Sequence, residues 1–260
     1  MWRFAKPKRS PRKSGRRTGL ARALSKLGHC SRSQAVQLIL AGRVTLNGTA
    51  RNNPETPVDL NRDKIRVDGA QVSAAAKIYL MLNKPRGIVT SAADEEGRST
   101  IYSLLKNPPE WLAPVGRLDK ASEGLLLLTN DSEWGAKIAA PETHLDKTYH
   151  VQIGGKLDEA TLQRPRAGVA HAGEFLRAKS ITILREGERN SWLEIILDEG
   201  KNRQIRRMLN SLGIEVFRII RIAIGPLQLG DLLKGASRNL TTEEKQSLDR
   251  AIRGRARRGL

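Results

Sequence analysis

Apolar and polar positions follow two different patterns in the segments that read as strands. Leu125–Leu128 is an unbroken apolar run, short enough for a strand that is buried on both faces. From residue 147 to residue 153 apolar and polar positions alternate, so that Tyr149, Val151 and Ile153 share one face of an extended segment. Both patterns therefore predict strands, one fully buried and one with two unlike faces.

Helical spacing is clear in one place and weaker in several others. Apolar residues at i, i+3, i+4 and i+7 predict an amphipathic helix that ends at Gly213. These residues are Ile205, Met208, Leu209 and Leu212. Further helices and strands are expected at 20–27, 31–40, 44–46, 65–67, 78–82, 101–105, 133–140, 192–197 and 216–224. Strands outnumber long helices and do not alternate regularly with them, which favours an α+β fold with a mixed, mostly antiparallel sheet and flanking helices.

The composition changes along the chain in a way that predicts two domains between two tails. Residues 1–17 hold little apolar content and are expected to be a disordered basic tail. Residues 18–69 form a small α+β unit, and the small and polar residues 70–77 are interpreted as a linker. A larger domain over 78–249 follows, and residues 250–260 are a second basic tail.

Charge indicates the kind of partner. The 260 residues include 46 Lys and Arg against 27 Asp and Glu, a formal net charge of +19. Thirteen of these cations lie in residues 1–19 and 250–260, which hold no acid, and taking them from +19 leaves +6 for the rest. A basic body with basic tails favours a polyanion such as RNA. An anionic membrane surface is the rival, but no amphipathic cationic helix supports it.

The lack of a recognisable targeting segment and the single cysteine favour the cytoplasm. No segment approaches the roughly 18 apolar residues of a membrane-spanning helix. No apolar run follows the basic N-terminus, so we expect no secretory signal. An organelle transit peptide is a second interpretation of that terminus, but Pro7, Pro11 and the lack of an amphipathic period favour an RNA-contacting tail. The single cysteine, Cys30, excludes an internal disulfide and a multi-cysteine metal site.

A short polar loop, Gly116–Asp119, precedes the buried leucine run. A carboxylate at the end of a buried strand is held rigidly and can still be reached by a ligand. Taken alone, Arg117 and Asp119 fit ordinary surface charges or turn chemistry equally well. The string Gly-Arg-Leu-Asp resembles the signature of the pseudouridine synthases, whose Asp is catalytic. Its continuation to Asp131 resembles the RsuA-type branch, which modifies ribosomal RNA, with Ser122 where that branch usually has Thr.

Two later motifs resemble the same family, in the family's order. Lys147-Thr-Tyr149-His-Val resembles the motif whose Tyr stacks on the target base, although Tyr149 alone fits plain core packing. Gln-Ile-Arg ending at Arg206 resembles the motif whose basic residue pairs with the catalytic Asp, although a solvated basic face is the alternative. The resemblance implies an Asp119–Arg206 ion pair that keeps the acid ionised, since an adjacent guanidinium lowers an Asp pKa by about 1–3 units. Arg117 would brace the space left by the flipped base, and Arg207 is a candidate RNA contact.

The small N-terminal domain carries its own resemblance. Residues 25–35 and 42–48 resemble the RNA-binding module named after ribosomal protein S-four. In that module the start of one helix and a Gly-Arg-Val strand present basic groups to structured RNA. The correspondence points to Arg32, Ser33 and Arg43 as RNA contacts, with a solvated side chain as the alternative for each arginine.

These resemblances imply a stand-alone rRNA pseudouridine synthase that works as a monomer in the cytoplasm. The reaction changes no oxidation state, so we expect no cofactor, and the scattered His144, His150 and His171 predict no metal site. Residues 202–208 most resemble the family members that modify large-subunit rRNA, which implies that substrate, with transfer RNA as the alternative. The alternative is a non-catalytic RNA-binding ribosome assembly factor, which explains the charge but not three motifs that fit one site.

Overall fold

The computed structural model describes residues 17–91, 96–106 and 111–256. The chain divides into two compact units, Met1–Ala76 and Lys77–Leu260. The expected N-terminal tail lies, except for Arg17, outside the described residues, and so do the last four residues of the expected C-terminal tail. Each unit has its own hydrophobic core.

The first unit packs two helices on a small sheet. Helix α1 spans Leu20–Lys26 and helix α2 spans Arg32–Leu40. The strands are β1 Thr18–Gly19, β2 Val44–Leu46, β3 Thr49–Ala50, β4 Pro57–Val58, β5 Ile65–Val67 and β6 Ala70–Gln71. Four of them form a sheet in the order β3-β2-β5-β6, and β1 pairs with β4. Helix α2 begins at a capping box, in which Gln34 N donates to Ser31 Oγ at 3.2 Å and Ser31 N donates to Gln34 Oε1 at 3.0 Å.

The first two residues of the expected linker belong to this sheet. Ala70 and Gln71 pair with Val67 and Arg66 as β6, because Asp68 and Gly69 form a tight turn that returns the chain along β5. The linker expected over 70–77 therefore begins later than the sequence indicated.

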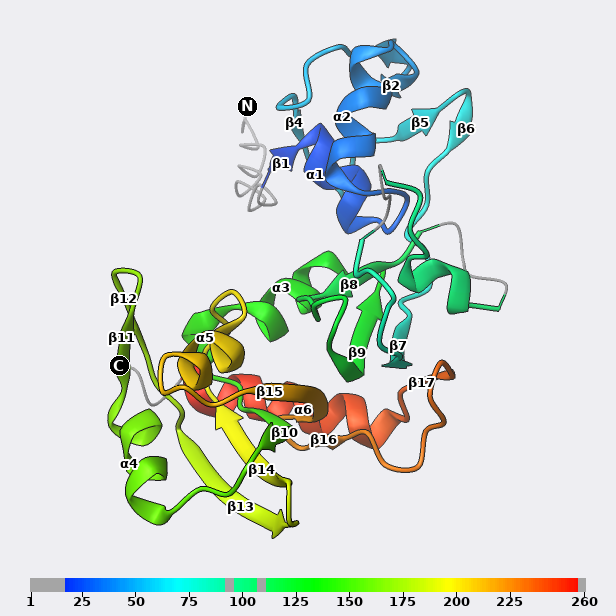
Figure 1. The fold of residues 1–260 in the computed structure, drawn as a ribbon. Helices are drawn as coiled ribbons and strands as arrows, with labels where there is room; N and C mark the ends of the chain where they lie inside the picture. Colours follow the sequence, from blue (N-terminus) through cyan, green and yellow to red (C-terminus); the bar gives the residue numbers. More distant parts are fainter. Residues whose placement is uncertain (1–16, 92–95, 107–110, 257–260) are drawn as a thin grey trace, which may run out of the picture. The chain divides into compact units, whose positions relative to one another are not determined.

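The second unit is built on a large sheet (Figure 1). Among the described residues nine strands form it, in the order β13-β14-β10-β15-β9-β7-β17, with β16 beside β15 and β8 beside β9. The strands are β7 Tyr79–Lys84, β8 Ala113–Val115, β9 Glu123–Thr129, β10 Lys147–Gly154, β13 Ser180–Glu186, β14 Asn190–Leu197, β15 Val216–Ile224, β16 Leu227–Gln228 and β17 Ser237–Asn239. Strand β15 runs parallel to β9, and the other neighbours pair antiparallel. The predicted mixed, mostly antiparallel α+β fold is confirmed.

Helices and a separate hairpin surround this sheet. The helices are the 3-10 turns η1 Ile101–Leu104 and η2 Pro141–Thr143, and α3 Ser132–Ala139, α4 Glu159–Ala167, α5 Gln204–Asn210 and α6 Thr242–Ala256. The hairpin consists of β11 Val169–His171 and β12 Glu174–Leu176. The boundary expected at residue 249 falls inside α6 and is corrected: Leu248 and Ile252, four residues apart, both pack into a core cluster, so the helix continues to Ala256.

Strand β9 lies at the centre of the unit and is buried along its whole length. Leu125 and Leu127 pack toward α3 and α6, while Leu126 and Leu128 pack toward η1. At Gly124, whose φ is +102°, an added Cβ would lie 2.2 Å from the carbonyl oxygen of Arg221 on β15. The parallel strands thus meet closely at the end of β9 that follows the Asp119 loop.

Strand β10 supplies the second predicted pattern. Val151 and Ile153 are fully buried and Tyr149 packs beside them, on the face predicted from the alternation. The apolar side of α5, including Met208 and Leu209, covers this part of the sheet. The element that carries Tyr149 and the helix that carries Arg206 are therefore packed together.

Candidate active site

The loop that carries Asp119 is held from below by a buried lysine. The Nζ of Lys84 donates to the carbonyl oxygens of Pro85 at 3.0 Å, Asp119 at 3.2 Å and Ser122 at 2.9 Å. The backbone N–H of Ser122 closes the turn on the carbonyl of Asp119 at 2.9 Å. Lys84 is fully buried, and its burial lowers its pKa to about 8.

Lys84 was not singled out from the sequence as a site residue. It is the last residue of strand β7, beyond the strand expected at 78–82. The available signal was a lysine at the end of an apolar strand, a position where its side chain can be buried. A buried lysine needs several hydrogen-bond acceptors, so such a lysine is expected to hold neighbouring carbonyl groups.

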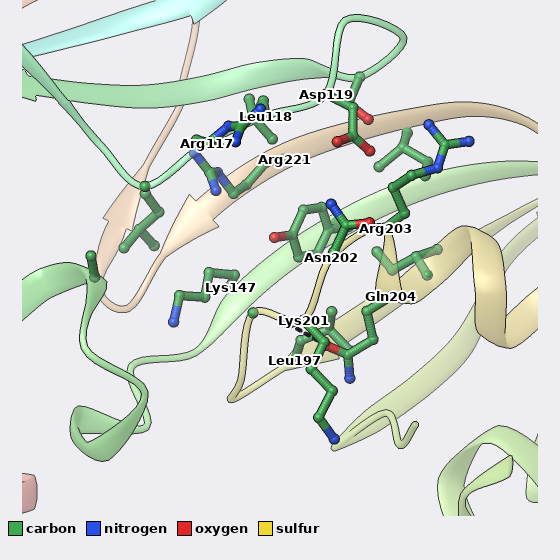
Figure 2. Close-up of a pocket in the computed structure, with 18 of the residues that line it drawn as sticks. Arg117, Leu118, Asp119, Lys147, Leu197, Lys201, Asn202, Arg203, Gln204 and Arg221 are labelled. Carbon is green, nitrogen blue, oxygen red and sulfur yellow. Dashed lines mark hydrogen bonds between the residues drawn. The ribbon is translucent and has the colours of Figure 1, made fainter. Parts of the chain in front are cut away.

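A cavity of about 400 Å³ opens beside this loop, within the size range of ligand pockets. Arg117, Asp119, Tyr149 and Arg206 all line it, so the structure brings together the four residues that the family motifs pointed to. They come from the loop before β9, from β10 and from α5. Figure 2 shows the side chain of Asp119 reaching from its loop toward the pocket.

The other predicted site residues lie elsewhere. Arg207 does not line the pocket; it forms an ion pair with Glu174 and donates to the carbonyl of His171 on the β11–β12 hairpin at 3.4 Å. In the first unit, Arg32 and Ser33 are exposed at the start of α2. Arg43 is exposed and bound bidentately to Asp68, at 2.8 and 2.6 Å.

The expected ion pair between Asp119 and Arg206 is not formed. Among the described residues no cation lies within 4.0 Å of the Asp119 carboxylate, and the Arg206 guanidinium instead donates to the carbonyls of Val216 at 3.0 Å and Ala121 at 3.4 Å. Burial lowers the pKa of Arg206, with a further lowering by Arg203, while the negative charge of Asp119 acts in the opposite direction. Arg206 therefore supports the loop backbone and affects Asp119 only through its longer-range field.

Arg221 is a second residue that sequence reasoning passed over. It interrupts the apolar strand β15, is 5% exposed and lines the same pocket. Its Nε donates to the carbonyl of Leu125 at 2.7 Å. Its Nη2 is sealed from solvent and has no hydrogen-bond partner. The charge inside an apolar run was the signal that could have found it.

A buried carboxylate joins three elements behind the pocket. Glu123, 3% exposed, accepts from Arg218 Nε at 2.6 Å and Nη2 at 3.1 Å, and Lys234 Nζ lies 2.6 Å away. The hydrogen bond from Arg218 chiefly lowers the pKa of Glu123, to about 2. This cluster links the start of β9 to β15 and to the loop before β17, and so fixes the strand end that follows Asp119.

The pocket is strongly cationic. Six basic residues line it against a single carboxylate, that of Asp119: Arg117, Lys147, Lys201, Arg203, Arg206 and Arg221. Figure 2 shows Arg117 and Arg221 near the Asp119 loop and Arg203 on the far side of Asp119. Such a lining suits a phosphate-bearing ligand whose reacting atoms meet one acid.

The described part of the chain offers neither a metal-binding cluster nor a membrane-spanning helix. Residues 17–91, 96–106 and 111–256 hold no group of three or more His, Cys, Asp or Glu side chains able to bind a metal ion. In the same ranges no helix has the length and apolarity needed to cross a bilayer.

Comparison with known families decides the identity. The family described as RNA pseudouridylate synthase matches residues 78–211, and the S4 domain family matches residues 18–65. The chain belongs to the RNA pseudouridylate synthase family. The RsuA-type resemblance and the expected isomerase class are confirmed, and nothing in the comparisons supports the non-catalytic assembly factor.

Relatives of this pseudouridine synthase cover nearly its whole length. An uncharacterised RNA pseudouridine synthase of Aquifex aeolicus is 40% identical over 88% of this chain and 92% of the relative. The ribosomal large subunit pseudouridine synthase B of Bacillus subtilis is 34% identical over 88% of this chain and 94% of the relative. A crystal structure of a pseudouridylate synthase is similar with a TM-score of 0.63 and 29% identity, covering 89% of this chain and 99% of the other.

Proposed function

We propose that this enzyme converts one uridine of ribosomal RNA, in the large subunit, to pseudouridine, with Asp119 as its catalytic residue. The observation that carries the proposal is the gathering of Arg117, Asp119, Tyr149 and Arg206 in one cationic pocket. The relationship to a large subunit pseudouridine synthase of Bacillus subtilis supports the choice of RNA.

The reaction needs a base to leave its stack and to be detached from its sugar. The bond between C1′ and N1 breaks, a bond between C1′ and C5 forms, C5 loses its hydrogen and N1 gains one. Unstacking costs a few kcal/mol, which the pocket would offset by stacking the base on Tyr149. Arg117, in the same loop as Asp119, would brace the vacated space in the RNA.

Asp119 would act as an ionised carboxylate. Its side chain has no cation within 4.0 Å among the described residues, so its oxygens are available to the substrate, and six cations on the pocket lining surround this one acid. Arg206 would hold the Asp119 loop through the carbonyl of Ala121. Lys84 would hold the same loop from the other side.

The N-terminal unit would dock the RNA. Arg32 and Ser33 are exposed at the start of α2, where backbone N–H groups and a guanidinium suit phosphate oxygens. Arg43 would add a contact in this unit after exchanging Asp68 for phosphate, and Arg207 would add one in the second unit after exchanging Glu174 for phosphate. We expect a monomer that works in the cytoplasm.

The test is a map of pseudouridine in the rRNA of cells that lack this protein and are complemented with wild type or with Asp119→Asn. One pseudouridine should disappear on deletion, return with the wild type and stay absent with Asp119→Asn, because an amide cannot replace the carboxylate. Asp158→Asn, which alters an exposed helix cap, is the matched control and should restore the modification. An unchanged map in the deletion strain would refute the proposal.

A further inference from the structure

The floor of the pocket holds a charged group without a counterion. The guanidinium of Arg221 uses one of its five N–H groups, in the bond to Leu125, and neither terminal nitrogen has a hydrogen-bond partner among the described residues. The nearby carboxylate of Glu123 is occupied by Arg218 and Lys234. A guanidinium is charged at any working pH, so a buried one is expected to meet an acceptor in some state of the protein.

The sheet places this group beside the expected base. Arg221 and Tyr149 are direct partners across the antiparallel pair β10–β15, so their side chains lie next to each other on the same face. On the other side of β15, Arg221 pairs with Gly124, and the Arg221 backbone lies so close to Gly124 that a Cβ there would be 2.2 Å from the Arg221 carbonyl oxygen, which fixes the position of Arg221 in the sheet. A base stacked on the Tyr149 ring would therefore present an edge to the Arg221 guanidinium.

Uracil offers carbonyl oxygens at its edge, and the reaction changes their charge. When the bond between C1′ and N1 breaks, its electron pair stays on the base and spreads over N1, O2 and O4. A fixed, water-excluded donor aimed at one of these oxygens binds the detached base more strongly than the intact nucleoside.

We propose that Arg221 is a further catalytic residue, whose terminal N–H groups donate to a carbonyl oxygen of the flipped uracil and stabilise the negative charge on the base while it is detached from the sugar. This inference rests on the proposed function. In this division of roles, Arg221 stabilises the negative charge on the detached base, and Asp119 carries out the chemistry at the sugar and the proton transfer.

The test uses a short RNA that spans the uridine identified by the rRNA map, synthesised with uridine, 2-thiouridine or 4-thiouridine at that position. The full-length wild type and the variants Arg221→Met and Arg221→Lys are compared for kcat and KM. Arg185→Met is the matched control, because Arg185 is exposed on β13 and contacts the Trp192 ring outside the pocket.

On uridine RNA, Arg221→Met should lower kcat about 100-fold with little change in KM, as for loss of one preorganised donor to a developing anion. Arg221→Lys should recover part of this loss, and Arg185→Met should match the wild type. Sulfur is a poor acceptor, so the advantage of the wild type over Arg221→Met should shrink below about tenfold on one of the two thio RNAs and persist on the other.

Three outcomes would overturn the inference while leaving the proposed function standing. The first is a wild-type kcat for Arg221→Met. The second is a rise in KM alone with a shallower salt dependence of binding, which would indicate a phosphate contact. The third is the same advantage of the wild type over Arg221→Met on all three RNAs, which would indicate a purely structural role. A wild-type enzyme that leaves the uridine RNA unchanged would instead refute the proposed function. Thermal unfolding and circular dichroism of Arg221→Met separate a folding defect from these results.

Discussion

At the scale of single residues, the backbone of the Asp119 loop depends on one buried ammonium group. Lys84 holds three carbonyl oxygens, two of them in the loop itself. Its burial lowers its pKa from 10.5 to about 8. The folded protein therefore loses this proton at a lower pH than the unfolded chain does.

Lys84→Met tests this role. We expect a loss of unfolding free energy of about 1–2 kcal/mol at pH 7, because the carbonyls lose a charged donor. Between about pH 8 and 10.5 the unfolded wild-type chain binds a proton that the folded form lacks, so this site makes wild-type stability rise with pH. The variant lacks that contribution, so the stability difference should widen over this range.

Urea denaturation at several pH values measures both effects. Lys137→Met, an exposed change on α3, is the control and should follow the wild type. A constant stability difference between Lys84→Met and wild type from pH 7 to pH 10.5 would contradict this account.

The sequence motifs correctly pointed to Asp119, Tyr149 and Arg206 as residues of one pocket, because each residue lies at a fixed position in a short motif. The predicted ion pair between Asp119 and Arg206 was wrong, because it depends on side-chain conformations that the spacing of residues in the sequence does not determine. Arg221 and Lys84 were not assigned because their partners are backbone carbonyls, which no sequence motif marks, and a charge within or at the end of an apolar strand was the only signal for them.

At the scale of elements, the close approach of β9 and β15 depends on Gly124. The parallel pairing joins Glu123 and Gly124 to Ile220 and Arg221, and an added Cβ at Gly124 would collide with the Arg221 backbone. This contact also sets the position of Arg221 relative to the start of β9.

Gly124→Ala should therefore destabilise the protein by about 3–5 kcal/mol, in the range of severe core substitutions. Gly213→Ala is the matched control: its φ is also positive, at +75°, but an added Cβ meets open space. It should cost about 1–2 kcal/mol from backbone strain alone. Equal losses for the two variants in denaturant titrations would show that the strands can separate without penalty.

Periodicity predicted the elements wherever one face is buried. Strand β9, strand β10 and helix α5 lie where the apolar patterns placed them. The errors fall where a boundary depends on tertiary contacts: β6 joins its sheet through a turn, and α6 continues because Ile252 meets the core. Parallel pairing of β15 with β9 joins residues about one hundred positions apart and leaves no local pattern.

At the scale of the whole molecule, charge, motif order and fold agree. The formal net charge of +19 suits an RNA substrate, and the pocket concentrates cations around one acid. Matches to an S4 domain and to the RNA pseudouridylate synthase family divide the chain in the same order as its two compact units. The sequence could predict this organisation because each unit carries its own motifs.

In the proposed reaction, Asp119 drives replacement of the C5–H bond of a uridine by a C5–C1′ bond. The most direct measurement is tritium release from ribosomal RNA labelled at C5 of uridine, with purified full-length protein and its Asp119→Asn variant. We predict release of one tritium per target uridine by the wild type and none above background by Asp119→Asn. Release at the wild-type rate by Asp119→Asn, or no release by the wild type, would contradict this prediction.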